Sequence, residues 1–165
     1  MRWIRKKGGP KHTKKNPDLI LIGFDKELSY KKIENVSKLV NAKTPYFLTN
    51  IDLSCPTPNG PIPDTGSIAN LIFKTTDIKY QESFGKPSMH LINFIKDTFE
   101  GYKIDLKKSI LAGDRIYTDI LMGKNMDIDT LHVLSGERKS SMNNQTKPTF
   151  QFNTLSDFLL WHYEV

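Results

Sequence analysis

Two aspartates in the segment 109–125 have the residue type and spacing best suited to chemistry. The apolar residues 110–112 end at Gly113, and Asp114 follows directly. This order predicts a buried strand that delivers a carboxylate at its carboxyl end, where ligands bind in open α/β sheets. Asp119 comes five residues later, in the first turn of an expected helix, where the helix dipole favours negative charge.

Two carboxylates at one strand end are suited to a hard cation. Mg2+ takes a few oxygen ligands from protein and completes its shell with water and substrate phosphate. The same spacing also fits a simpler interpretation, in which Asp114 closes a turn and Asp119 caps a helix. The spacing alone leaves both interpretations open.

The composition narrows the class of protein. A length of 165 residues suits one ordinary domain or two incomplete ones. No apolar run approaches the ~20 residues that span a bilayer, and the N-terminus lacks the apolar core of a secretory signal. Cys55 is the single cysteine, which excludes an internal disulfide and agrees with a reducing compartment. We therefore expect a soluble, cytoplasmic protein that does not bind a membrane.

The net charge of +6 is concentrated at the N-terminus. Residues 1–16 contain seven of the 24 Lys and Arg residues and no acid, so 17 basic and 18 acidic residues remain elsewhere. Such an arm can bind phosphate backbones, which makes nucleic-acid binding an alternative function. No nucleic-acid motif follows it. We favour a disordered basic tail for residues 1–16, because this segment has no apolar period.

The remaining sequence alternates between strand and helix patterns. Strands are expected at 19–24, 46–49, 110–112, 130–134 and 150–152, and helices at 29–40, 67–74, 87–101 and 155–161, with one more after Asp114. Proline suits a first helical position, so Pro87 is expected to open its helix. The prolines and glycines of residues 49–66 predict an irregular loop. The βα alternation predicts an α/β fold with a mostly parallel sheet.

Three segments resemble motifs of the haloacid dehalogenase (HAD) superfamily. They are Thr-Asn-Ile-Asp at 49–52 with Pro-Asp-Thr-Gly-Ser-Ile at 63–68, Gly-Lys-Pro-Ser at 85–88, and Gly-Asp-Arg-Ile-Tyr-Thr-Asp-Ile at 113–120. Within the superfamily they are most similar to the 4-nitrophenylphosphatase, phosphoglycolate phosphatase and NagD-like group. The resemblance covers residue 18 to about residue 160. It implies a Rossmann-like core with a mobile α/β cap.

The resemblance also implies an activity and residue roles. This group consists of Mg2+-dependent phosphatases that act on small phosphorylated metabolites through a phospho-aspartate. Lys86 matches the catalytic lysine that holds the phosphoryl group and the attacking carboxylate together. Asp114 matches the Mg2+ ligand, and Asp119 matches the neighbour that supports the metal and its waters. Asn50 and Asp52 match the start of a cap loop that contributes to substrate choice. Charge neutralisation of this kind is what phosphoryl transfer requires.

The family's nucleophile motif, Asp-x-Asp after a strand near the N-terminus, has no counterpart in this sequence. Asp25-Lys-Glu27 falls where the family has a cap strand, and Asp-Ile-Asp at 127–129 precedes its strand. We therefore expect residues 17–80 to be the second half of a cap. Residues 81–165 are expected to be the C-terminal half of a Rossmann-like core.

An incomplete core has consequences for activity and association. Without a nucleophile the chain is expected to be inactive alone, because the two-step path through a covalent intermediate is lost. It is expected to self-associate or to require the missing N-terminal half, since an unpaired apolar sheet edge promotes association. The alternative is a non-catalytic remnant that binds Mg2+ or a phosphorylated ligand.

Overall fold

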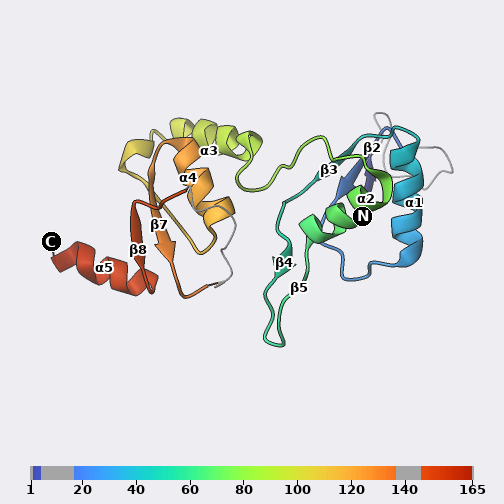
Figure 1. Ribbon diagram of the computed structural model, residues 1–165. Helices are drawn as coiled ribbons and strands as arrows, with labels where there is room; N and C mark the ends of the chain where they lie inside the picture. The colour runs from blue at the N-terminus through green and yellow to red at the C-terminus, as the bar shows by residue number, and fades with distance from the viewer. Residues whose placement is uncertain (1, 5–16, 137–145, 165) are drawn as a thin grey trace. The chain divides into compact units, whose positions relative to one another are not determined.

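The computed structural model describes residues 2–4, 17–136 and 146–164, and the chain divides into two compact units (Figure 1). The first unit is Met1–Gly85 and the second is Lys86–Val165. The sequence analysis placed this boundary between residues 80 and 81. The structure thus assigns the segment 81–85 to the first unit, where Ser83 forms a parallel bridge with Leu48.

The first unit is a small sheet covered by two helices. Its elements are β1 (Arg2–Ile4), β2 (Leu19–Ile22), α1 (Tyr30–Asn41), β3 (Tyr46–Leu48), β4 (Ser54–Cys55), β5 (Ile62–Pro63) and α2 (Thr65–Thr76). The sheet order is β1-β2-β3. β2 and β3 are parallel, as the strand–helix–strand pattern predicted.

The core of the first unit follows from the sequence periodicity. Ile20 and Ile22, alternate residues of β2, are fully buried and pack in one cluster with Val36 and Val40 of α1. The Ser29 Oγ accepts a hydrogen bond from the Lys32 N–H at 3.4 Å, which confirms the expected N-cap of α1.

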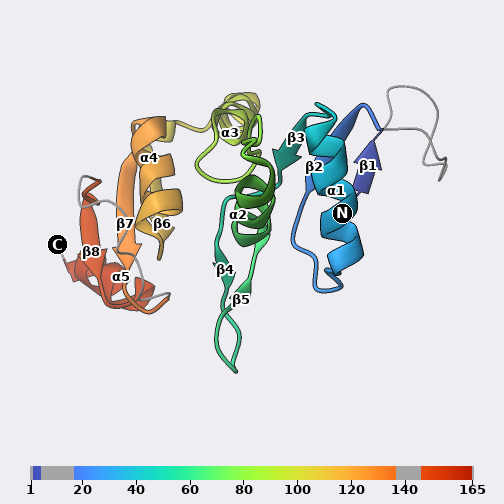
Figure 2. The ribbon, with the colours of Figure 1, turned by 45° about the vertical axis from the view of Figure 1, so that its right-hand side comes forward.

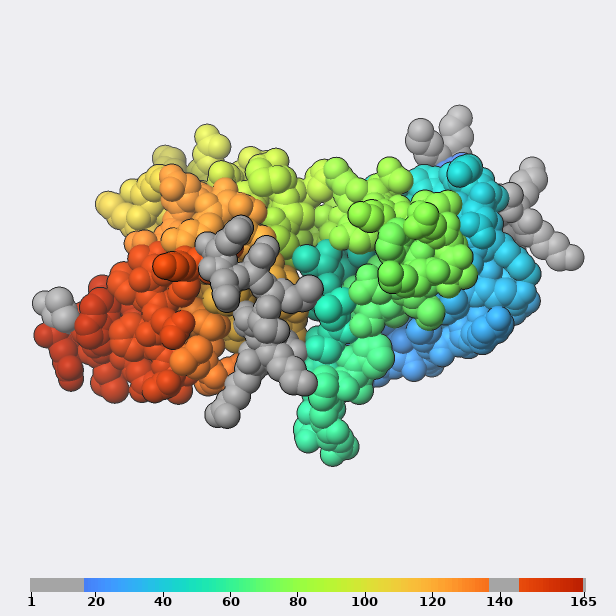
Figure 3. Space-filling view, viewed as in Figure 1, coloured from blue at the N-terminus to red at the C-terminus, as the bar shows by residue number. Residues whose placement is uncertain are grey.

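Two expectations for the first unit need correction. β1 pairs antiparallel with β2, so residues 2–4 are not an irregular tail, whereas residues 5–16 lie outside the described residues. The segment 49–66 contains the β4–β5 hairpin, which projects from the rest of its unit (Figures 1 and 3). Pro63 is compatible with this hairpin, because both strands of a two-stranded ribbon are edge strands that need few N–H donors.

The second unit is a parallel α/β unit. Its elements are α3 (Met89–Gly101), the 3-10 turn η1 (Leu106–Lys108), β6 (Ile110–Gly113), the π-helical turn η2 (Ile116–Ile120), α4 (Leu121–Met126), β7 (Asp129–Val133), β8 (Phe150–Phe152) and α5 (Leu155–Glu164). All three strands run parallel in the order β6-β7-β8. This arrangement confirms the predicted Rossmann-like α/β fold.

The helix α3 begins two residues later than expected. Ser88 is its N-cap, and the Ser88 Oγ accepts a hydrogen bond from the Leu91 N–H at 3.3 Å. Pro87 therefore precedes the cap and is not the first helical residue. The serine cap determines the start because its hydroxyl satisfies a backbone donor that the helix leaves unpaired.

Helices lie on both faces of the sheet in the second unit (Figure 2). On the α4 face, a Cβ at Gly123 would lie 2.3 Å from Cγ2 of Thr130 in β7. On the other face, the Phe150 and Phe152 rings lie 5.7 and 5.5 Å from the Phe158 ring of α5. Neighbouring residues of a strand point to opposite faces, and Thr130, Leu131 and His132 are all buried, so β7 is covered on both sides.

The strand β6 is more exposed than its apolar sequence predicted. Ile110 is 39% exposed and Ala112 is also exposed. α5 packs against β8, and among the described residues β6 pairs with β7 alone. The expectation of a buried strand is thus wrong for this chain, because β6 is an edge strand with one open face. No helix in the described part of the chain is long and apolar enough to cross a membrane.

Candidate active site

The clearest feature of the second unit is an ion pair between two predicted site residues. The Lys86 Nζ donates a hydrogen bond to the Asp119 Oδ1 at 2.5 Å, although the residues are 33 positions apart. The Asp119 side chain is 6% exposed and that of Lys86 is 47% exposed. The fold therefore holds a buried carboxylate against an ammonium group that still reaches solvent.

A second contact fixes the other oxygen of Asp119. The Arg115 backbone N–H donates to the Asp119 Oδ2 at 3.2 Å. A Cβ at Gly113 would lie 2.2 Å from the Asp119 Cβ and 2.5 Å from its Oδ2. The carboxylate thus fills the space that glycine leaves at the end of β6. Asp119 belongs to the π-helical turn η2, and π-helical turns are often found at functional sites.

Asp114 follows the carboxyl end of β6, as the sequence predicted. Its side chain packs against Gly136, where a Cβ would lie 2.1 Å from the Asp114 Oδ2. Its backbone carbonyl accepts a hydrogen bond from the His132 Nε2 at 3.1 Å. The contacts of His132 and Gly136 with Asp114 were not predicted from the sequence, because they depend on β7 lying beside β6.

The donor set at this strand end fits Mg2+. Asp114 and Asp119 each lie against a glycine that leaves room for a carboxylate and for no Cβ. Mg2+ is usually bound by one or two carboxylates plus waters and substrate phosphates. Within residues 2–4, 17–136 and 146–164 no group of three or more His, Cys, Asp or Glu forms a denser metal cluster. Asp114 and Asp119 would therefore hold the ion in part, and the Lys86 ammonium would attract an anion beside it.

The comparison with protein families agrees with this geometry. Residues 83–158, which include Lys86, Asp114 and Asp119, match the family described as HAD-hydrolase-like. This part of the chain belongs to the HAD-like hydrolases.

Individual relatives extend the HAD-like similarity to most of the chain. An acid sugar phosphatase of Staphylococcus epidermidis is 31% identical over 143 residues, which are 84% of this chain and 53% of that protein. The crystal structure of 4-nitrophenylphosphatase from Thermotoga maritima is 33% identical with a TM-score of 0.72, and the match covers 87% of this chain and 54% of that one. A putative NagD protein is 30% identical with a TM-score of 0.73, over 88% and 55% of the two chains.

These HAD-like relatives confirm the resemblance inferred from the motifs. They also show that the chain spans about half the length of the proteins it matches.

Asn50 and Asp52 lie in the first unit, after β3. The Asn50 Oδ1 accepts from the Asp52 N–H at 3.0 Å, and its Nδ2 donates to the Thr65 Oγ1 at 3.3 Å. The Gly66 N–H donates to the Asp52 carbonyl at 2.8 Å. These bonds shape the turn that leads into α2. The assignment of Asn50 and Asp52 to substrate binding stays a prediction.

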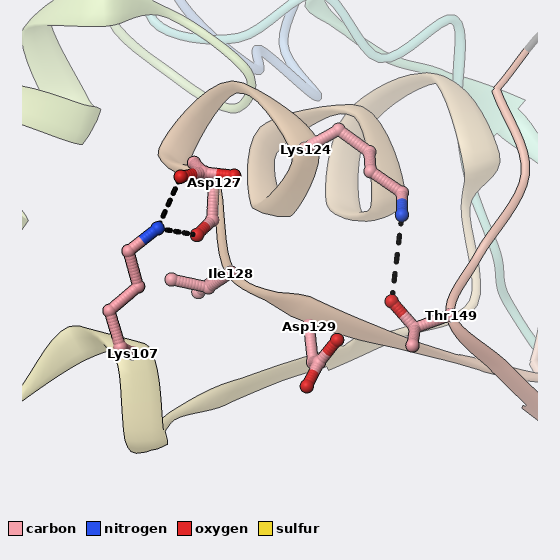
Figure 4. A pocket seen from close by; sticks show the side chains of 6 residues that line it. All are labelled: Lys107, Lys124, Asp127, Ile128, Asp129 and Thr149. Atoms are coloured by element: carbon pink, nitrogen blue, oxygen red, sulfur yellow. Dashed lines mark hydrogen bonds and ion pairs between the residues drawn. The ribbon is translucent and has the colours of Figure 1, made fainter.

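A pocket of about 280 Å³ in the second unit is lined by other residues, namely Lys107, Lys124, Asp127, Ile128, Asp129 and Thr149 (Figure 4). Lys107 precedes β6, Asp129 begins β7 and Thr149 precedes β8, so the pocket is at the amino ends of the parallel strands. Asp114 follows the carboxyl end of β6, so it lies at the opposite end of the strands from this pocket. We therefore place the candidate site at the carboxyl ends of the strands, where ligands bind in open α/β sheets, and not at this pocket.

The two aspartates that were set aside as nucleophiles, Asp25 and Asp127, both have a lysine partner. Asp127 precedes β7, and the hydrogen bond from Lys107 lowers the pKa of its carboxyl group (Figure 4). Asp25 accepts from the Lys32 Nζ at 2.8 Å and from the Glu27 N–H at 2.9 Å, and the hydrogen bond from Lys32 lowers its pKa. Their rejection as nucleophiles stays a prediction.

Proposed function

We propose that Lys86, Asp114 and Asp119 supply the lysine and the metal-binding carboxylates of a Mg2+-dependent phosphatase. The observation that carries this proposal is the contact between Lys86 and Asp119 beside the strand end that presents Asp114. The substrate class is small phosphate monoesters, because the similar proteins are named for acid sugar phosphatase and 4-nitrophenylphosphatase activities.

Each residue has a distinct part in the proposed reaction. The Lys86 ammonium binds the phosphoryl oxygens and neutralises charge that builds up during transfer. Asp119 holds that ammonium in place through the 2.5 Å contact. Asp114 would coordinate Mg2+, and the bound ion would supply further neutralisation of the phosphate charge.

The attacking carboxylate is proposed to come from a segment outside this sequence. In the HAD superfamily it attacks phosphorus and forms a phospho-aspartate, which water then hydrolyses. The edge of β6 that faces away from β7 is the proposed docking place for the strand that carries it. Two observations support this: β6 is an edge strand among the described residues, and the relatives are about twice as long as the chain.

Reconstitution tests the proposed function. The chain is mixed with the part of Thermotoga maritima 4-nitrophenylphosphatase that the match leaves uncovered, and light scattering establishes that the two associate. Release of 4-nitrophenol from 4-nitrophenyl phosphate is then followed with and without Mg2+. We expect Mg2+-dependent turnover from the complex and none above background from either part alone. A stable complex without turnover, or equal turnover by the chain alone, would contradict the proposal.

A further inference from the structure

A ladder of polar side chains crosses the carboxyl ends of the three strands in the second unit. His132 of β7 lies opposite Gly113 of β6 and opposite Gln151 of β8. Its side chain is buried, with 8% exposure. The His132 Nε2 lies 3.1 Å from the Asp114 carbonyl oxygen, and its Nδ1 lies 3.3 Å from the Gln151 Oε1.

The contact with Asp114 identifies the protonated nitrogen of His132. A backbone carbonyl only accepts hydrogen bonds, so the Nε2 must carry the proton. In the neutral ring the Nδ1 is then an acceptor. A half-turn of the Gln151 amide presents its NH2 group to that nitrogen, and such flips leave the shape of the side chain unchanged. The ladder therefore suits an imidazole that donates from its Nε2 toward β6.

The Asp114 carbonyl that His132 binds belongs to the same peptide unit as the Arg115 N–H, which makes a second contact in the site. The Asp114 C=O and the Arg115 N–H lie in one planar group and point in opposite directions. The Arg115 N–H donates to the Asp119 Oδ2 at 3.2 Å, and the Asp119 Oδ1 accepts from the Lys86 Nζ at 2.5 Å. One continuous chain of hydrogen bonds thus runs from the imidazole to the lysine.

We propose that His132 is a positioning residue, which orients the peptide between Asp114 and Arg115 and thereby the Asp119 carboxylate and Lys86. This inference rests on the proposed function for its consequence, namely the binding of metal and phosphate. The physical basis is that an oriented peptide keeps its N–H aimed at the carboxylate, and linked hydrogen bonds polarise one another. Loss of the imidazole donor removes this hydrogen bond from the carbonyl and weakens the restraint on the peptide.

Two variants of the full chain separate positioning from packing. His132→Gln keeps an amide N–H donor at a similar reach, and His132→Leu keeps a comparable volume without a donor. Amide hydrogen exchange is measured by NMR for Arg115, with the Ile128 amide, which donates to the Gly123 carbonyl, as an internal control. We expect exchange at Arg115 to accelerate by roughly fivefold to tenfold in His132→Leu. It should stay near the original rate in His132→Gln, and Ile128 should not change in either variant.

Mg2+ titration of the same variants reports the consequence. Loss of groups that orient metal ligands typically weakens metal binding by about 10- to 100-fold, so we expect about a tenfold loss of affinity in His132→Leu. His132→Gln should restore it, and Lys107→Ala, at the amino ends of the strands, should leave it unchanged. An original chain that binds no Mg2+ would overturn the proposed function, whereas the Arg115 exchange would still decide the hydrogen-bond chain.

The original chain provides a test that needs no variant. The 15N chemical shifts of the His132 ring show which nitrogen carries the proton. We expect the tautomer protonated at Nε2. A neutral ring protonated at Nδ1, or equal Arg115 exchange in the original chain and in His132→Leu, would overturn the positioning role.

Discussion

Asp114→Asn is expected to abolish Mg2+-dependent turnover in the reconstituted complex. The substitution preserves the size of the side chain and therefore its packing against Gly136. It also keeps the hydrogen bond that the backbone carbonyl of residue 114 accepts from the His132 side chain. It removes the negative charge that would hold Mg2+. Since a catalytic metal contributes several kcal/mol of charge stabilisation, we expect kcat/KM to fall by about a thousandfold or more. The measurement is 4-nitrophenol release over a range of Mg2+ concentrations.

Asp127→Asn is the matched control for this variant. Asp127 is another carboxylate of the second unit, which pairs with Lys107 at the amino ends of the strands. Its substitution should leave turnover and Mg2+ dependence unchanged. Equal losses in the two variants would show a general effect of charge on the unit and would contradict a metal role for Asp114.

Lys86→Ala is expected to lower kcat/KM about 100- to 1,000-fold in the same complex, the usual effect of removing one preorganised group that stabilises transition-state charge. The buried Asp119 carboxylate would lose its cation but keep the bond from the Arg115 N–H. Because the Asp119 side chain is only 6% exposed, the loss of its cation is also expected to lower the melting temperature, so kcat/KM is compared at a temperature where both proteins are folded.

Lys107→Ala separates this effect from the loss of any surface lysine. Lys107 pairs with Asp127 and is more exposed than Lys86. We expect the Lys107 variant to retain full turnover. A Lys86 variant with normal kcat/KM would contradict the assignment of this lysine to the phosphoryl group.

Much of the site could be predicted because it depends on local sequence. The apolar run that ends at Gly113 places Asp114 at a strand end whatever surrounds it. The contact between Lys86 and Asp119 joins segments 33 residues apart, and no spacing rule gives it. The resemblance to the HAD superfamily assigned Lys86 and Asp119 to one site, but it did not predict this contact.

The errors have physical causes in particular elements. A lone histidine in an apolar strand is usually a core residue, and the role of His132 appears only when the register places it opposite Gly113. The exposure of Ile110 depends on the neighbours of β6 rather than on its apolar sequence. Prolines argued against strands in 49–66, yet a two-stranded hairpin tolerates Pro63 opposite Ser54.

The most direct test of the metal site uses Mn2+ with the full chain. Mn2+ prefers the same oxygen ligands as Mg2+, and its unpaired electrons broaden the NMR signals of nearby amides. We predict that substoichiometric Mn2+ broadens the amides of residues 113–120 first, that excess Mg2+ reverses the broadening, and that Asp114→Asn prevents it. Broadening centred on Asp127 and Asp129, or unchanged in Asp114→Asn, would contradict a metal site at the carboxyl end of β6.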